Sequence, residues 1–166
     1  ARSDYHVDMT HLASLDTDAL LKQCKLGRSR SSGPGGQHRN KVETAVTITH
    51  TASQISGSAS ERASQADNRR VALFRLRINL ALQVRSPKGA TTGGRFRVPV
   101  NPEHDDFPAV LAEALDAIAD HEFDAKAAAA QLGCSTSQLI KLLRAEPRSL
   151  IWVNQHRGLA GMHALH

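Results

Sequence analysis

One glycine-rich stretch of this sequence combines residue types that could take part in chemistry: Ser31-Ser32-Gly33-Pro34-Gly35-Gly36-Gln37. Glycine permits positive φ angles and a close approach of the backbone to another molecule, while proline fixes one φ angle and stiffens the loop. Basic residues flank the stretch on both sides: Lys25, Arg28, Arg30, Arg39 and Lys41. The pattern predicts a stiff tip that enters a negatively charged partner. A phosphate-cradling turn or a plain surface loop is the simpler alternative.

The distribution of charge favours such a partner. Residues 1–100 contain 16 Lys and Arg against 7 Asp and Glu, residues 101–124 contain 8 acids and no Lys or Arg, and residues 125–166 contain 5 basic residues against 1 acid. Positive charge thus surrounds the glycine-rich loop, as is typical of nucleic-acid binding. Arginines outnumber lysines by 15 to 6, and the guanidinium fork matches phosphate geometry well. A basic surface that only maintains solubility is the alternative.

Length and composition exclude several classes of protein. The 166 residues suffice for one domain, or for a core domain with a small appendage, and no apolar run is long enough to span a membrane. The polar segment 1–15 fits neither a secretory signal nor a transit peptide. Cys24 and Cys134 lack a CxxC partner and suit a reducing compartment. The 9 histidines show no metal-ligand spacing. We expect a protein of the cytoplasm or an organelle matrix, without metal or cofactor.

Two strands are expected to hold the loop. Residues 24–30 lead into it, and residues 44–51, which alternate β-branched or apolar positions with polar ones, lead out of it. One short helical turn is expected at 40–44. A short helix at 16–23 and a weaker strand at 54–58 complete this part, the latter pairing with 44–51 as an antiparallel hairpin.

A long helix is expected next, capped by Ser64 and continuing to about Val84. Its apolar stripe consists of Val71, Leu73, Phe74, Leu76, Ile78 and Leu80. The remaining positions carry arginines, at Arg69, Arg70, Arg75, Arg77 and Arg85. The pattern predicts the principal core helix, packed across the sheet with a basic outer face.

Residues 86–100 are rich in Gly and Pro and indicate a loop or linker, in which Phe96, Val98 and Val100 suggest a short extended segment. After residue 105 the pattern becomes helical. The expected helices begin near Pro108, at Ala125 (ending at Gly133), at Ser135 with capping-box spacing, and at Pro147, the last continuing to about Gln155 and closing near Gly158.

The run from Ser32 to Val46 resembles the signature of class I peptide chain release factors. More narrowly, it is similar to their short relatives, the codon-independent ribosome-rescue peptidyl-tRNA hydrolases. The strand ending at His50, and Ser64-Gln65 with Asn68 at the start of an Arg-rich helix, extend the resemblance. It covers about residues 16–85.

The resemblance implies hydrolysis of the ester between a nascent peptide and P-site tRNA, with water as the nucleophile. In the family the backbone N–H of the motif glutamine helps to stabilise charge on the ester oxygen or the leaving 3′-hydroxyl. By match, that role falls on Gln37, whose side chain would shape a cavity that admits water. Gly35 and Gly36 would adopt the required backbone angles at little cost. His38 is expected to contact phosphate or solvent rather than to act as a general base.

The same resemblance, with the charge pattern, implies a set of RNA contacts. They are expected from Arg28, Arg30, His38, Arg39, Lys41, Arg62, Arg69 and Arg70. The implied partners are the ribosomal RNA of the peptidyl transferase centre, P-site peptidyl-tRNA and a methyltransferase acting on Gln37. A monomer without a membrane partner is expected.

Some positions depart from the family pattern. Arg39 replaces a small apolar residue, Ala52-Ser53-Gln54-Ile55 replaces a Pro-Thr-Gly-Ile turn, and Ala63 stands where the family has arginine, although Arg62 lies one place earlier. The chain is also too short for codon-reading and tRNA-mimicking domains, so stop-codon recognition is not expected. Its C-terminal residues lack the Lys/Arg-rich tail that is common in the rescue hydrolases.

Residues 127–143 resemble a helix-turn-helix, with an Ala-rich first helix, Gly133 at the turn, and a second helix carrying Lys141; Arg144 follows. This element would either bind RNA or DNA or pack as an ordinary small bundle.

Taken together, the expected elements predict an α+β fold, with a small mixed or antiparallel sheet and one long helix. The expected division is a polar segment 1–15, a catalytic domain 16–100 and a helical subdomain 101–166. The alternative function is a non-enzymatic RNA- or DNA-binding regulator that uses the helix-turn-helix.

Overall fold

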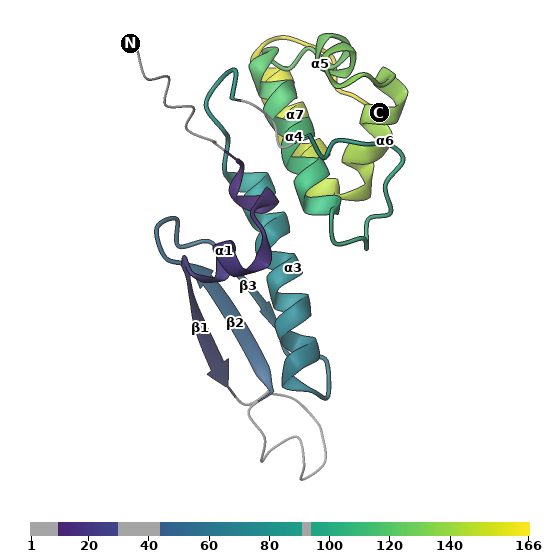
Figure 1. The fold of residues 1–166 in the computed structure, drawn as a ribbon. Helices are drawn as coiled ribbons and strands as arrows, with labels where there is room; N and C mark the ends of the chain where they lie inside the picture. Colours follow the sequence, from purple (N-terminus) through teal and green to yellow (C-terminus); the bar gives the residue numbers. More distant parts are fainter. Residues whose placement is uncertain (1–9, 30–43, 91–93) are drawn as a thin grey trace, which may run out of the picture.

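The computed structural model describes residues 10–29, 44–90 and 94–166. A three-stranded sheet and a long helix form one half, and a group of shorter helices lies beside the C-terminal end of that long helix (Figure 1). In chain order the elements are η1 (Leu12–Ser14), α1 (Thr17–Leu21), β1 (Cys24–Ser29), β2 (Ala45–His50), β3 (Ser56–Ala59), α3 (Gln65–Gln83), α4 (Phe107–Asp120), α5 (Ala125–Leu132), α6 (Thr136–Ala145) and α7 (Pro147–Leu159). The expected α+β class is confirmed.

The sheet is antiparallel throughout, in the order β1-β2-β3. In β2, Val46, Ile48 and His50 are buried and the two threonines between them are half-buried, which confirms the alternation expected from the sequence. The expected hairpin is also present, but its second strand begins at Ser56 rather than Gln54. The turn before it places Gln54 at φ 60°, in the left-handed region. Gln54 stands where the Pro-Thr-Gly-Ile turn mentioned above has its glycine, so the left-handed conformation is kept although the glycine is not.

Helix α3 packs across one face of the sheet, and its centre lies unusually close to β3 (Figure 1). A Cβ atom on Gly57 would lie 2.3 Å from the carbonyl oxygen of Ala72 and 2.3 Å from the backbone nitrogen of Leu76. Both atoms belong to the α3 backbone, which cannot rotate away as a side chain can. Only glycine therefore fits at this crossing, and it fixes the distance between sheet and helix.

The expected basic outer face of this helix is wrong for two of the arginines assigned to it, Arg77 on α3 and Arg85 just beyond its end. Arg77 donates hydrogen bonds to the carbonyl oxygens of Ala13 (3.1 Å) and Leu15 (2.6 Å), around η1. Arg85 forms a largely buried ion pair with Asp116 on α4, at 2.8 Å. Burial lowers the pKa of both guanidinium groups, although neither loses its charge near neutral pH. These side chains turn inward because η1 and α4 cover the C-terminal half of α3.

Residues 10–15, which belong to the N-terminal segment expected to be polar, contribute to the core. Ala13 is buried, and so is His11, whose Nδ1 accepts the Ala13 N–H while its Nε2–H donates to the Val84 carbonyl, at 2.8 Å. Burial lowers the pKa of His11 below its ordinary value. The imidazole is thus held neutral, as a bridge between η1 and the end of α3.

The connection between α3 and α4 is fastened to α4 by carboxylates. Glu113 accepts the backbone N–H groups of Arg95 (2.8 Å) and Phe96 (3.1 Å). Asp116 accepts the N–H of Ser86, and Asp120 accepts that of Gly89. Residues 96–100 form no strand with a described residue, and the apolar side chains of Phe96, Val98 and Val100 pack against the core. Both described stretches of the connection, 84–90 and 94–106, are thus tied to α4.

Local capping signals explain where the C-terminal helices begin and end. Asp124 accepts N–H groups at the start of α5, and Gly133 ends that helix at φ 72°. Ser135 and Gln138 form the expected capping box of α6, and Pro147 opens α7. The buried faces of α4 to α7 join α3 and the sheet in one hydrophobic core.

Candidate nucleic-acid interface and the stem of the glycine-rich loop

The glycine-rich loop itself lies outside the described residues. This holds for Gly35, Gly36 and Gln37, for Arg30, His38, Arg39 and Lys41, and for the helical turn expected at 40–44 apart from Thr44. The structure does describe where the chain leaves β1 and where it enters β2. Ser29 pairs with Ala45 across the two strands, so the segment containing the motif starts and ends at one end of the hairpin (Figure 1).

Asn68 clamps the β2 side of this stem. Its side chain is fully buried, and its Nδ2 donates to the carbonyl oxygens of Thr44 (2.7 Å) and Arg62 (3.0 Å). Its Oδ1 accepts the backbone N–H of Arg62, at 2.9 Å. One amide thus joins the residue before β2, the turn after β3 and the first turn of α3. The sequence pointed to Asn68 only as part of a motif, and its positioning role was missed because no local pattern shows which distant backbone it contacts.

Ser64 and Asp67 organise the first turn of α3. The Ser64 hydroxyl oxygen accepts the Asp67 N–H at 3.0 Å, while the hydroxyl hydrogen is donated to the Asp67 carboxylate at 2.7 Å. The expected N-cap is therefore confirmed. It begins the helix at the end of the molecule where β1 ends and β2 begins (Figure 1).

Four of the expected RNA-contacting arginines lie in the described part of the chain. All are exposed, and none of their side chains makes a hydrogen bond or ion pair with another described residue; they are Arg28, Arg62, Arg69 and Arg70. Arg28 lies on β1, Arg62 in the turn before α3, and the other two in the first turns of α3. The structure therefore brings these cations to the loop end of the molecule, where they remain available to phosphate groups.

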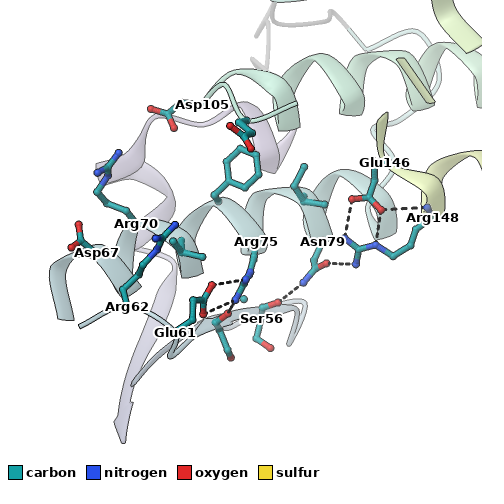
Figure 2. Close-up of a pocket in the computed structure, with 16 residues that line it drawn as sticks. Ser56, Glu61, Arg62, Asp67, Arg70, Arg75, Asn79, Asp105, Glu146 and Arg148 are labelled. Atoms are coloured by element: carbon teal, nitrogen blue, oxygen red, sulfur yellow. Dashed lines mark hydrogen bonds and ion pairs between the residues drawn. The ribbon is translucent and has the colours of Figure 1, made fainter. Parts of the chain in front are cut away.

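A groove of about 1220 Å³ runs along α3 between β3 and the start of α7 (Figure 2). Both Arg62 and Arg70 line it at one end. Farther along, Arg75 pairs with Glu61 at 2.7 Å, and Arg148 pairs with Glu146 at 2.7 Å. The groove also contains Asp67, Glu103 and Asp105, so it is not cationic along its whole length. Only its loop end combines unpaired arginines with open space.

Two side chains of α3 that line the same groove bond to the backbone of β3. Arg75 donates to the Ser58 carbonyl at 2.8 Å, and Asn79 donates to the Ser56 carbonyl at 2.7 Å. Hydrogen bonds from the Glu61 and Ser60 backbone N–H groups, together with Arg75, hold the pKa of the Glu61 carboxyl below its ordinary value. Glu61 stays ionised and keeps Arg75 in place.

The described residues offer little for side-chain catalysis. His50 is buried, with Nδ1 bonded to the Ser53 hydroxyl (2.7 Å) and Nε2 facing the Gln23 side-chain oxygen (3.3 Å). Burial raises the pKa of the Cys24 and Cys134 thiols, which disfavours the nucleophilic thiolate. Within the described ranges, no group of three or more His, Cys, Asp or Glu side chains could hold a metal ion. This part of the chain contributes a scaffold and cations.

The same ranges contain no helix that is both long and apolar enough to cross a membrane.

Comparison with known proteins matches the part of the chain that contains the sheet and α3 to one family. Residues 16–94 match the model of the RF-1 domain. Over 66 residues, 40% of this chain, the sequence is 53% identical to peptide chain release factor 1 of Chlorobaculum tepidum, covering 18% of that protein. Over 43 residues, 26% of this chain, it is 56% identical to a peptide chain release factor homolog of Escherichia coli, covering 21% of that protein.

A third relative is peptide chain release factor 1 of Acidiphilium cryptum, which is 46% identical over 76 residues, or 46% of this chain and 22% of that protein. The chain thus spans about a fifth of the length of these curated relatives. The matched span 16–94 contains the glycine-rich motif, both strands of its stem and the whole of α3. Residues 16–94 of this chain are therefore an RF-1 domain, the catalytic domain of class I peptide chain release factors.

Proposed function

We propose that this protein releases the nascent peptide from P-site peptidyl-tRNA in the peptidyl transferase centre of the ribosome, without reading a codon. The observation that carries the proposal is the RF-1 domain at residues 16–94, which includes an intact Gly35-Gly36-Gln37. The stem described above supports it, because Ser29 and Ala45, between which the motif lies in the sequence, are at the same end of the molecule as four arginines that bond to no other described residue.

The proposed reaction is ester hydrolysis by water. The water oxygen attacks the ester carbonyl carbon, the bond from that carbon to the tRNA 3′-oxygen breaks, and a proton passes to the 3′-oxygen. The backbone N–H of Gln37 donates to the oxygen on which charge develops, and its side chain limits the cavity to water. A fixed donor of this kind lowers a barrier by about 3–4 kcal/mol.

The cations have a separate proposed role. Arg28, Arg62, Arg69 and Arg70, with Arg30, His38, Arg39 and Lys41 of the loop segment, bind the phosphates of ribosomal RNA and tRNA. Asn68 acts as a positioning residue, since it holds the carbonyl of Thr44 at the base of the motif. The proposed partners are ribosomal RNA, P-site peptidyl-tRNA and a methyltransferase that modifies Gln37. A monomer in the cytoplasm or an organelle matrix fits this work.

A peptide-release assay on purified ribosomes tests the proposal. The ribosomes carry labelled peptidyl-tRNA in the P site, and the A site is either empty or occupied by a stop codon. The full chain should release the peptide equally well in both cases, because no codon contact is invoked. Release that requires the stop codon would contradict codon independence, and no release with either template would contradict the hydrolase.

Two variants test the chemistry within the same assay. Gly36→Ala should lower the release rate about 100-fold or more, because the added Cβ disfavours the backbone angles that present the Gln37 N–H. Gln37→Ala should admit larger nucleophiles, so release by added hydroxylamine should rise relative to release by water. The matched control is Gln155→Ala, an exposed glutamine on α7, which should behave as the unmodified chain. An unchanged rate for Gly36→Ala would refute the backbone mechanism.

A further inference from the structure

We propose that α5 and α6 form a helix-turn-helix whose outer face, on α6, binds structured RNA. This surface lies outside residues 16–94 and none of the contacts of the proposed reaction uses it. The proposal stands on the packing, exposure and charge of α5 and α6. Only the choice of RNA as the nucleic acid rests on the proposed function.

The packing of the two helices fits the motif. Helix α5 ends at Gly133, and α6 begins after the Ser135 cap, so a turn of three residues joins them. Ala128 and Ala129 are buried on α5, and Leu139 and Leu142 are buried on α6. Helix α4 contacts both and completes a three-helix unit. The small buried alanines let α6 lie close to α5, and the αL glycine allows the sharp change of direction.

The opposite side of α6 is exposed and polar. Ser137, Gln138, Lys141 and Arg144 recur at spacings of one, three and three, which places them on one face of the helix. Neither Lys141 nor Arg144 makes a hydrogen bond or ion pair with a described residue. In Figure 1, α6 lies at the edge of the helical group, on the side away from α3. The face is therefore open to a partner.

Part of the acidic segment 101–124 is engaged elsewhere in the fold. Glu113, Asp116 and Asp120 are directed at the connection between α3 and α4, where they accept backbone N–H groups. Asp124 accepts N–H groups as the cap of α5. After residue 124 the chain holds 5 Lys and Arg against 1 acid, and that acid, Glu146, is paired with Arg148. Four of the eight acids in residues 101–124 are thus engaged within the fold rather than directed at α6.

The chemistry of the face favours RNA over a protein partner. No large hydrophobic side chain of α6 is among the exposed ones, so the face itself is polar; the exposed Ile151, which lines a hollow with Arg144, belongs to α7. Hydroxyl, amide and cationic groups match the phosphates and 2′-hydroxyls of the wide minor groove of an RNA helix. Because residues 16–94 are proposed to act within the ribosome, folded RNA is the partner that both halves of the chain share. Binding to duplex DNA is the alternative that the experiment below distinguishes.

Fluorescence anisotropy of the full chain with a labelled, fully paired RNA hairpin tests the proposal, over a series of salt concentrations. The variant Lys141→Gln/Arg144→Gln removes the two cations of α6. The control Lys22→Gln/Lys88→Gln removes two exposed lysines elsewhere and changes the net charge equally. The α6 variant should bind about tenfold more weakly, and the slope of log affinity against log salt should shrink by about 2, since each cation contacts one phosphate. The control should keep the slope of the unmodified chain.

Equal behaviour of the two variants would overturn the proposal, because it would assign the binding to net charge alone. Tighter, α6-dependent binding to a DNA duplex of the same sequence would overturn the choice of RNA. Thermal unfolding at the same midpoint checks that the variants are folded. The anisotropy measurement requires neither ribosomes nor peptide release. A chain that binds the hairpin through α6 but releases no peptide would refute the proposed function and leave the α6 surface standing.

Discussion

The two halves of α3 use the same residue type in opposite ways. In the N-terminal half, Arg69 and Arg70 are exposed and bond to no other described residue. In the C-terminal half, Arg77 bonds to the carbonyls of Ala13 and Leu15, and beyond the helix end Arg85 pairs with Asp116 on α4. The difference comes from what covers each half, since η1 and α4 approach only the second. An arginine on a helix becomes structural where a neighbouring element supplies acceptors, and remains available to a ligand where none does.

The largest effect is expected from a variant that separates α3 from the sheet, because both halves of the helix would then lose their surroundings. In Gly57→Ala the new Cβ would overlap the backbone of Ala72 and Leu76, so the free energy of unfolding should fall by more than about 3 kcal/mol. Urea unfolding followed by circular dichroism measures it, and failure of the variant to fold agrees with the prediction. Gly27→Ala is the control, because its nearest atom would be 3.7 Å away. Equal stability of the two variants would show that sheet and helix are not in this tight contact.

The next effect concerns the structural half of α3. Arg85→Ala leaves the Asp116 carboxylate largely buried without its cation, and we expect a loss of about 3 kcal/mol in unfolding free energy. The matched change is Arg75→Ala on α3, whose pair with Glu61 is about half exposed on both sides and should cost less than about 1 kcal/mol. Urea midpoints at equal m-values give both numbers. A ranking in the reverse order would show that burial does not separate the two arginines.

The smallest effect on stability should come from the exposed half. Arg69→Gln/Arg70→Gln should change the unfolding free energy by less than about 0.5 kcal/mol, since neither side chain bonds to another described residue. Its affinity for purified ribosomes, measured by co-sedimentation, should nevertheless fall and depend less steeply on salt. If the double variant is destabilised as strongly as Arg85→Ala, these arginines are structural and the contrast between the halves fails.

Much of the secondary structure could be predicted because its causes are local. The alternation in β2, the caps at Ser64 and Ser135, and the start of α5 at Ala125 each depend on residues within a few positions of one another, and each is confirmed. The antiparallel pairing of β2 with β3 followed from the short turn between them.

What the sequence did not show depends on contacts between distant segments. The inward direction of Arg77 and Arg85 is set by the approach of η1 and α4, which are separated from them along the chain. The same is true of Asn68, whose partner Thr44 is 24 residues away, and of the tight crossing at Gly57. The roles of Gly35, Gly36 and Gln37 remain predictions, since those residues lie outside the described ranges.

The hydrogen bonds from α3 to β3 also bear on how copies of this protein meet. A sheet can grow between molecules when the outer carbonyl and N–H groups of an edge strand are free to pair with another chain. At β3, Arg75 and Asn79 already occupy the carbonyls of Ser58 and Ser56, so an incoming strand would first have to displace them. The other edge, β1, carries Lys25 and Arg28, which repel the same strand of a second copy. The cations that suit an RNA partner thereby also oppose aggregation of the sheet.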